Sequence, residues 1–116
     1  MSKALGEFEQ LLLLALLGLP PEQAYGVPIR DLIEQRTGRT LSAGAVYTAL
    51  DRLEEKGLVS SRSSAPAPER GGRRKRLYRL EPGGAEALAK TVQTFRDMSR
   101  GLLPRLDAIV GGGRAP

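Results

Sequence analysis

The clearest hydrophobic periodicity in the chain lies between residues 41 and 59. Apolar side chains recur there at helical spacing: Val46, Ala49, Leu50 and Leu53. This pattern predicts an amphipathic helix over residues 42–56 with that stripe buried. Ser42 is placed to cap the first turn, and Gly57 lies where a left-handed residue closes a helix.

The opposite face of this helix begins with small residues and continues with polar ones. Gly44 stands near its start, and Tyr47, Thr48 and Arg52 follow on or beside the same face. A helix with so little side chain at its N-terminal end can approach another surface closely, as a recognition helix approaches DNA. The polar side chains can then donate to phosphates or base edges. An ordinary surface helix that begins with small residues remains the alternative.

Two further helices are predicted before it. Residues 6–18 are apolar nearly all round, which indicates burial on more than one side. In so short a chain we expect the second side to meet another subunit, although a central core helix of a monomer is the alternative. Residues 25–28 open the next helix, with Pro28 tolerated in its first turn, and Thr37-Gly38 ends it.

Alternating residues in 58–62 and 75–80 predict two antiparallel strands joined by a long loop. The loop tip, residues 63–72, is polar and is expected to be mobile. Residues 60–80 hold seven basic side chains and one acidic one, whereas the whole chain has a net charge of +5. Such a basic hairpin beside a recognition helix is suited to gripping duplex phosphates, and an ordinary solvated hairpin is the alternative. The cations expected on phosphates include Arg70, Arg73, Arg74, Lys75 and Arg76.

A long helix is predicted to follow, over residues 81–103, with a further turn or two as far as residue 110. Its seam repeats at intervals of four and three residues, with polar Ser99 as one break in an otherwise apolar series: Leu88, Val92, Phe95, Ser99, Leu102 and Leu106. That spacing is typical of a coiled coil. Gly101 and Pro104 are expected to bend or end the helix. Residues 111–116 are expected to be a disordered tail.

Composition excludes several classes of function. The 116 residues are enough for one domain with one modest core. There is no cysteine and no histidine, so the sequence offers neither a thiol nucleophile nor the usual general base and metal ligands. We therefore expect no enzyme, no metal site and no cofactor. The apolar run at residues 11–17 is too short for a membrane span, and we expect a cytoplasmic protein without a membrane partner.

These elements together predict a mainly α fold with a small β-wing. The predicted organisation is a winged helix-turn-helix DNA-binding domain over 1–80, a C-terminal dimerisation helix over 81–110 and a tail over 111–116. The sequence also resembles the PadR-like family of transcriptional regulators. The similarity rests on five blocks: LLLALL at 12–17, Tyr25-Gly26, LSAGAVYTAL at 41–50, LEEKGLV at 53–59 and RLYRL at 76–80.

The resemblance implies a homodimer that joins through its first and last helices, binds operator DNA and usually represses. Five positions fall where this family meets DNA: Tyr25, Ser42, Gly44, Tyr47 and Thr48. Residues 73–76 fall on its wing. The single predicted C-terminal helix is similar to a short subgroup, some of whose members bind planar drugs between the subunits.

Pairing of the first and last helices predicts two sets of residues, one at a dimer interface and one around a pocket. The expected dimer interface consists of Phe8, Leu12, Ala15, Leu88, Val92, Phe95, Ser99 and Leu102. A pocket for a small hydrophobic or planar effector is a further hypothesis, with Phe8, Leu12, Ala15, Phe95 and Met98 as its lining. Plain dimer packing is the alternative for the second set, because apolar stripes usually pack.

The leading hypothesis is a sequence-specific regulator that binds double-stranded DNA as a homodimer and represses transcription. Helix 42–56 would enter the major groove, the wing over 58–80 would hold phosphates, and an effector would release the DNA. Two alternatives are a winged-helix module for protein contacts and a small-molecule sensor that does not read an operator. The charge of −1 over residues 43–56 favours protein contacts, whereas the net +6 of residues 60–80 favours DNA.

Overall fold

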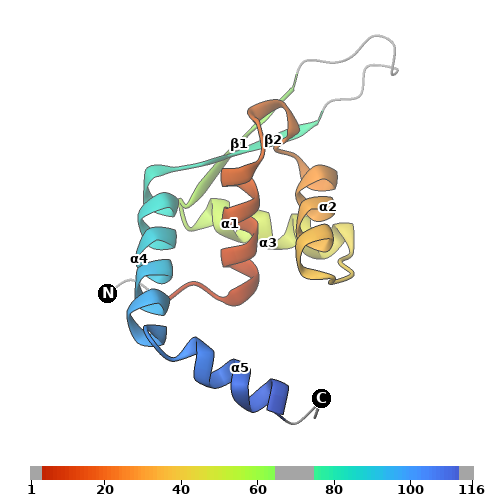
Figure 1. The fold of residues 1–116 in the computed structure, drawn as a ribbon. Helices are drawn as coiled ribbons and strands as arrows, with labels where there is room; N and C mark the ends of the chain where they lie inside the picture. The colour runs from red at the N-terminus through yellow and green to blue at the C-terminus, as the bar shows by residue number, and fades with distance from the viewer. Residues whose placement is uncertain (1–3, 65–74, 113–116) are drawn as a thin grey trace.

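The computed structural model describes residues 4–64 and 75–112. Within them lie five α-helices, one short 3-10 helix and two strands (Figure 1). In chain order they are α1 (Glu7–Gly18), η1 (Pro21–Gln23), α2 (Gly26–Thr37), α3 (Ala43–Glu55), β1 (Val59–Ser63), β2 (Arg76–Leu80), α4 (Pro82–Ser99) and α5 (Leu103–Gly112). The expected mainly α fold with a two-stranded wing is confirmed. Arg70, Arg73 and Arg74 and the tail from residue 113 lie outside the described residues.

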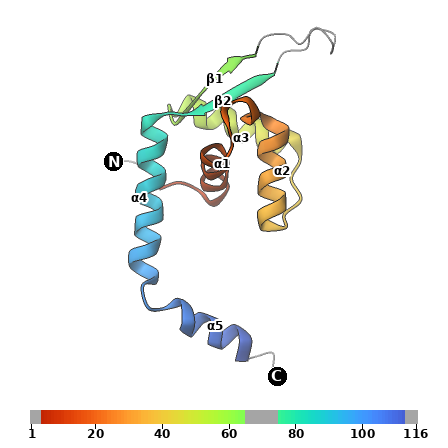
Figure 2. The same ribbon diagram turned by 45° about the horizontal axis from the view of Figure 1, so that its top comes forward.

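Helix α1 occupies the centre of the molecule, between α2 on one side and α4 on the other (Figures 1 and 2). Helix α3 crosses it and closes the core. Seven side chains are essentially inaccessible to solvent: Leu12, Leu13, Ile29, Val46, Leu50, Leu53 and Val59. They come from α1, α2, α3 and β1, so one core ties the helix-turn-helix to the wing.

Three residues expected at a subunit interface belong instead to this core. Leu12, Ala15 and Leu88 are buried within the single chain, so they offer almost no surface to a second copy. The reason is the central place of α1, whose apolar residues are covered by three helices of the same subunit. Its outward-facing apolar side chains are Leu14 and Leu17, which are 44% and 66% exposed. The hydrophobic pattern alone could not tell which side of so apolar a helix is covered.

The ends of α3 are as expected. The Ser42 hydroxyl oxygen accepts a hydrogen bond from the Ala45 amide at 3.1 Å, and Gly57 closes the turn after the helix with φ 77°. The turn between α2 and α3 carries a contact that the sequence did not reveal. The Leu41 amide donates to a Glu34 carboxylate oxygen at 2.7 Å, which fixes the entry of the chain into α3.

The two strands of the wing pair antiparallel from Val59 opposite Leu80 to Ser63 opposite Arg76. Pairing continues one residue further, because the Ser64 amide donates to the Lys75 carbonyl at 2.7 Å. The pairing therefore extends beyond the expected strand end at residue 62 into the tip that the sequence predicts to be mobile, and residues 65–72 lie outside the described part. The Tyr78 amide donates to the Ala24 carbonyl at 2.7 Å, which anchors the wing to the segment before α2.

The C-terminal helix is not continuous. Helix α4 ends at Ser99, Gly101 takes a left-handed backbone with φ 75°, and α5 starts at Leu103. Because a left-handed residue interrupts the helical hydrogen-bonding ladder, the expected seam cannot run unbroken past it. Helix α5 leaves the body at an angle (Figures 1 and 2). Gly111 and Gly112 are helical, so a tail starting at residue 111 was also a wrong expectation.

Residues 93–112, which we call the C-terminal arm, are all exposed except half-buried Ser99. The arm carries a series of large apolar side chains: Phe95, Met98, Leu102, Leu103, Leu106, Ile109 and Val110. Among the described residues, no helix combines the length and the hydropathy needed to cross a membrane.

Candidate nucleic-acid interface

The outer face of α3 presents the expected polar positions to solvent. Ser42, Gly44, Tyr47, Thr48 and Arg52 are all exposed. The buried stripe on the opposite side holds this face outward, because Val46, Leu50 and Leu53 are fixed in the core. The exposed face is broad and begins with almost no side chain, so a flat or convex partner can come close to the backbone.

Tyr47 lies against the start of α2. A Cβ atom on Gly26 would come within 2.3 Å of the Tyr47 ring, so only glycine permits this contact. Gly26 is itself buried, whereas Tyr47 keeps 37% of its surface exposed. The Tyr47 ring thus packs α3 against the start of α2 while part of the residue stays exposed. The sequence contained the Tyr25-Gly26 pair but could not show what the glycine makes room for.

Lys75, which lies just before β2 at the loop end of the wing, contacts the residue that precedes α2. Its ammonium lies 4.4 Å from the centre of the Tyr25 ring and donates a 3.3 Å hydrogen bond to the Tyr25 hydroxyl. Tyr25 is half-buried and precedes the first turn of α2. A cation over an aromatic face is held in place while it keeps donors for an anion. The structure therefore brings together two predicted residues that lie 50 positions apart in the sequence.

Arg76 takes part in a different set of contacts. Its guanidinium donates to Asp51 at 3.1 Å, to Glu54 at 2.6 Å and to the Ser61 hydroxyl at 3.0 Å. The Ser61 hydroxyl in turn donates to Glu54 at 2.9 Å. All three guanidinium nitrogens are therefore directed at groups of this chain, whereas the sequence interpretation placed Arg76 on phosphates. The three partners were missed, because the spacing of residues along α3 does not show which strand lies beside it.

Tyr78 lies beneath this network. Its ring centre is 5.4 Å from the Arg76 guanidinium carbon, and the residue is 3% exposed. Burial raises the pKa of the Tyr78 phenol to about 12, against an ordinary value of 10.0. The phenol therefore stays protonated over the whole physiological range and serves as an apolar support for the wing.

The residues expected to line an effector pocket do not converge within one subunit. Leu12 is in the core, and Ala15 borders a groove of about 270 Å³ between α1 and α2. Phe95 and Met98 are 63% and 76% exposed on the arm, and Phe8 is half-buried. A second groove, of about 380 Å³, lies between α1 and α4. Its lining includes Leu14, Leu17, Val92 and Arg96.

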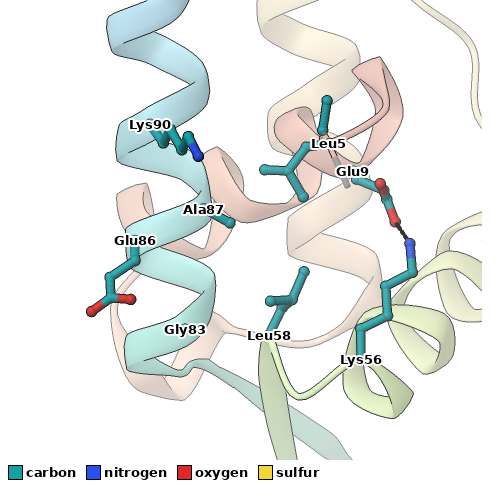
Figure 3. A pocket seen from close by; sticks show the side chains of 9 residues that line it. Leu5, Glu9, Lys56, Leu58, Gly83, Glu86, Ala87 and Lys90 are labelled. Carbon is teal, nitrogen blue, oxygen red and sulfur yellow. Dashed lines mark hydrogen bonds and ion pairs between the residues drawn. The ribbon is translucent and has the colours of Figure 1, made fainter. Parts of the chain in front are cut away.

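The most spacious of the described grooves was not anticipated. About 600 Å³ lies between the start of α1, the turn after α3 and the first turns of α4 (Figure 3). Leu5, Leu58 and Ala87 form its floor. At its rim the Lys56 ammonium is 2.5 Å from a Glu9 carboxylate oxygen, and this hydrogen bond lowers the pKa of Glu9. Lys56 is thereby held against the body and directed away from the outer face of α3.

Comparison with known proteins places this geometry in a family. The model of the transcriptional regulator PadR-like family matches residues 13–90. The transcriptional regulator Rv3488 of Mycobacterium tuberculosis is 32% identical over 78 residues, covering 67% of this chain and 69% of that protein. An uncharacterized 37.1 kDa protein in transposon TN4556 of Streptomyces fradiae is 36% identical over 87 residues. That match covers 75% of this chain but spans only 23% of the longer relative.

Comparison with solved structures supports the same family. A PadR family transcription regulator from Clostridium difficile R20291 superposes with a TM-score of 0.70 at 27% identity. The match covers 87% of this chain and 99% of that one. Family members are transcriptional regulators and not enzymes. The family model, matched over residues 13–90, spans the central helices, the wing and the first half of α4. These are the elements that build the surface described above. The chain therefore belongs to the PadR-like family of DNA-binding transcriptional regulators.

Proposed function

We propose that the chain acts as a homodimeric repressor that reads a specific duplex sequence. Helix α3 enters the major groove, and the wing holds the flanking phosphates. The observation that carries this proposal is the exposed face of α3, where small residues precede Tyr47 and Thr48. Base edges are reached only where a helix comes close, and phosphate contacts fix its register.

The electrostatic part of the affinity falls on the wing and the start of α2. Just past the end of α3, Lys56 is held by Glu9, and within α3 three acidic residues outnumber the one cation, Arg52. Lys75, poised over Tyr25, and the neighbouring Arg73 and Arg74 supply the positive charge that duplex phosphates require. Tyr25 and Ser42 complete the surface as donors at the starts of the two helices.

Dimerisation is supported by the apolar arm. Its exposed large side chains and the neighbouring Leu14 and Leu17 form a surface that a monomer would leave in water. A two-fold dimer would present two α3 helices to successive turns of the duplex. The groove between α1 and α4 borders this surface, so a second subunit could close it into a site for a hydrophobic or planar effector that releases the DNA.

The test is protection of the DNA upstream of the protein's own coding region, combined with transcription from that region in vitro. We expect two protected half-sites about one helical turn apart and a fall in transcript. Thr48→Ala should weaken protection, whereas Thr94→Ala, an exposed threonine on α4, should not. Equal protection by the two variants would show that α3 does not read the site, and a rise in transcript would exclude repression.

A further inference from the structure

We propose that Arg76 is a positioning residue that ties the wing to the recognition helix and neutralises two of its carboxylates, and that it does not contact DNA phosphates. This inference rests on the proposed DNA interface. It concerns how the interface is assembled, and it assigns Asp51, Glu54 and Ser61 a part in that assembly.

The geometry of the network supports a tether. Arg76 is the first residue of β2 and pairs with Ser63, the last residue of β1, at the loop end of the wing. Its planar fork reaches Asp51 and Glu54, which lie one turn apart on α3, and its third nitrogen reaches Ser61 on β1. A rigid fork that bridges two acids fixes an angle as well as a distance. Three elements are thereby held in one arrangement, α3, β1 and β2.

The charges support a second role. Asp51 and Glu54 lie on the helix that faces the DNA, and the Asp51 side chain is half exposed. Two uncovered carboxylates there would repel phosphates. Arg76 covers both, and its own charge is thereby engaged within the protein. Lys75, one residue earlier, has no carboxylate partner among the described residues and keeps its charge for the DNA.

Adjacent cations therefore have opposite expected behaviour, which makes Lys75→Ala the matched control for Arg76→Ala. Binding of the dimer to operator and to random duplex is measured over a series of salt concentrations. Lys75→Ala should weaken binding to both DNAs alike. It should also flatten the slope of log K against log salt by about 2 units, because each phosphate contact releases about 0.9 counterion and the dimer loses one contact in each subunit. Arg76→Ala should flatten the slope much less than Lys75→Ala does, because no phosphate contact is lost. It should also weaken binding to random duplex, because the two uncovered carboxylates then repel phosphates. It should weaken the operator complex about tenfold, because exposed ion-pair networks are lost in two subunits.

A triple variant separates the two roles of Arg76. In Arg76→Ala/Asp51→Asn/Glu54→Gln the uncovered carboxylates are gone, so binding to random duplex should return to the wild-type level. Binding to the operator should stay weak, because the tether is still missing. A triple variant as weak on random duplex as Arg76→Ala would overturn the neutralising role. A slope flattened by Arg76→Ala as much as by Lys75→Ala would make Arg76 a phosphate contact.

The tether can also be measured without DNA, which separates its failure from failure of the proposed function. The chain has no native cysteine, so spin labels can be placed on Glu55→Cys of α3 and Arg62→Cys of β1 alone. The distance distribution should be narrow in the otherwise wild-type protein and broad with Arg76→Ala. With Arg76→Lys, which keeps the charge but cannot bridge both acids, it should again be broad. An unchanged distribution in both variants would overturn the tether, whatever the DNA result.

Discussion

The winged-helix body, residues 4–64 and 75–92, and the C-terminal arm treat their apolar residues in opposite ways. In the body, Leu12, Leu50 and Leu53 are wholly buried by neighbours in the same chain. On the arm, Phe95, Met98 and Ile109 are 63% to 76% exposed. The core of the body is therefore complete within one subunit, whereas the arm leaves an apolar surface in water, which the proposed dimer would cover. This contrast separates the residues that maintain the fold from those available for assembly.

The largest effect is expected when charge is placed on the exposed apolar surface of the arm. Phe95→Asp combined with Met98→Asp costs a lone subunit little, because both side chains are exposed. In a dimer the carboxylates would be buried without partners, at a cost of several kcal/mol. We expect a folded monomer by sedimentation, while Lys90→Asp, at an exposed position on the same helix but outside the arm, remains dimeric. A double variant that still sediments as a dimer would place the interface elsewhere.

Truncation of the core gives the next largest effect. In the monomeric double variant, Leu50→Ala should lower the free energy of unfolding by about 2–5 kcal/mol, because it leaves a cavity among α1, α2 and α3. Leu106→Ala on the arm should change it by less than about 0.5 kcal/mol, because that side chain is 55% exposed. Urea denaturation compares the two. Similar losses would mean that the arm packs on its own body in solution.

The sequence predicted the body better than the arm for a physical reason. The limits of α3 are set by local signals, the Ser42 cap and the Gly57 turn, and both are confirmed. The break at Gly101 was recognised as a bend, but the extent of α5 was not, because three glycines at its end favour coil. Which side of α1 is covered depends on distant helices, so Leu12 and Ala15 were misplaced.

The candidate site shows the same limit. Sequence periodicity placed Tyr47 and Thr48 beside or on the exposed face, where they are found. The basic segment was visible as composition, yet composition cannot distinguish neighbouring cations. Lys75 meets an aromatic ring and Arg76 meets two carboxylates, and only the pairing of β2 with the rest of the fold decides this.

Removing positive charge from the wing should have a smaller effect, and that effect should be on DNA binding and not on folding. Changing Arg73, Arg74 and Lys75 together to Ala should flatten the salt slope of DNA binding by up to about 5 units in the dimer. Operator and random duplex should weaken alike, because phosphate contacts carry no sequence information. Arg105→Ala on the arm removes a cation far from α3 and should leave the slope unchanged. An unchanged slope in the wing variant would revive a protein-binding role for this face.

The smallest effect concerns Tyr78, a residue of the body that buries a polar group. The Tyr78 hydroxyl is buried and has no hydrogen-bond partner in the described structure. Tyr78→Phe should therefore keep the stability at pH 7 or raise it by up to about 1–3 kcal/mol. Because the folded-state pKa is about 12 and the ordinary value is 10.0, wild-type stability should fall as the pH rises from 10 to 12. Chemical denaturation at both pH values should show a smaller fall in the Phe variant, and an identical fall would contradict the buried phenol.

In the proposed complex, two copies of α3, joined through their arms, read one duplex site. Selection of binding sites from a random duplex library tests it directly, because no operator needs to be known beforehand. The wild-type protein should enrich a two-fold symmetric sequence whose half-sites are centred about 10 base pairs apart or a multiple of that. Thr48→Ala should enrich a relaxed version of it. Enrichment of no sequence, or of a single unrepeated half-site, would contradict binding of one duplex site by two copies of α3.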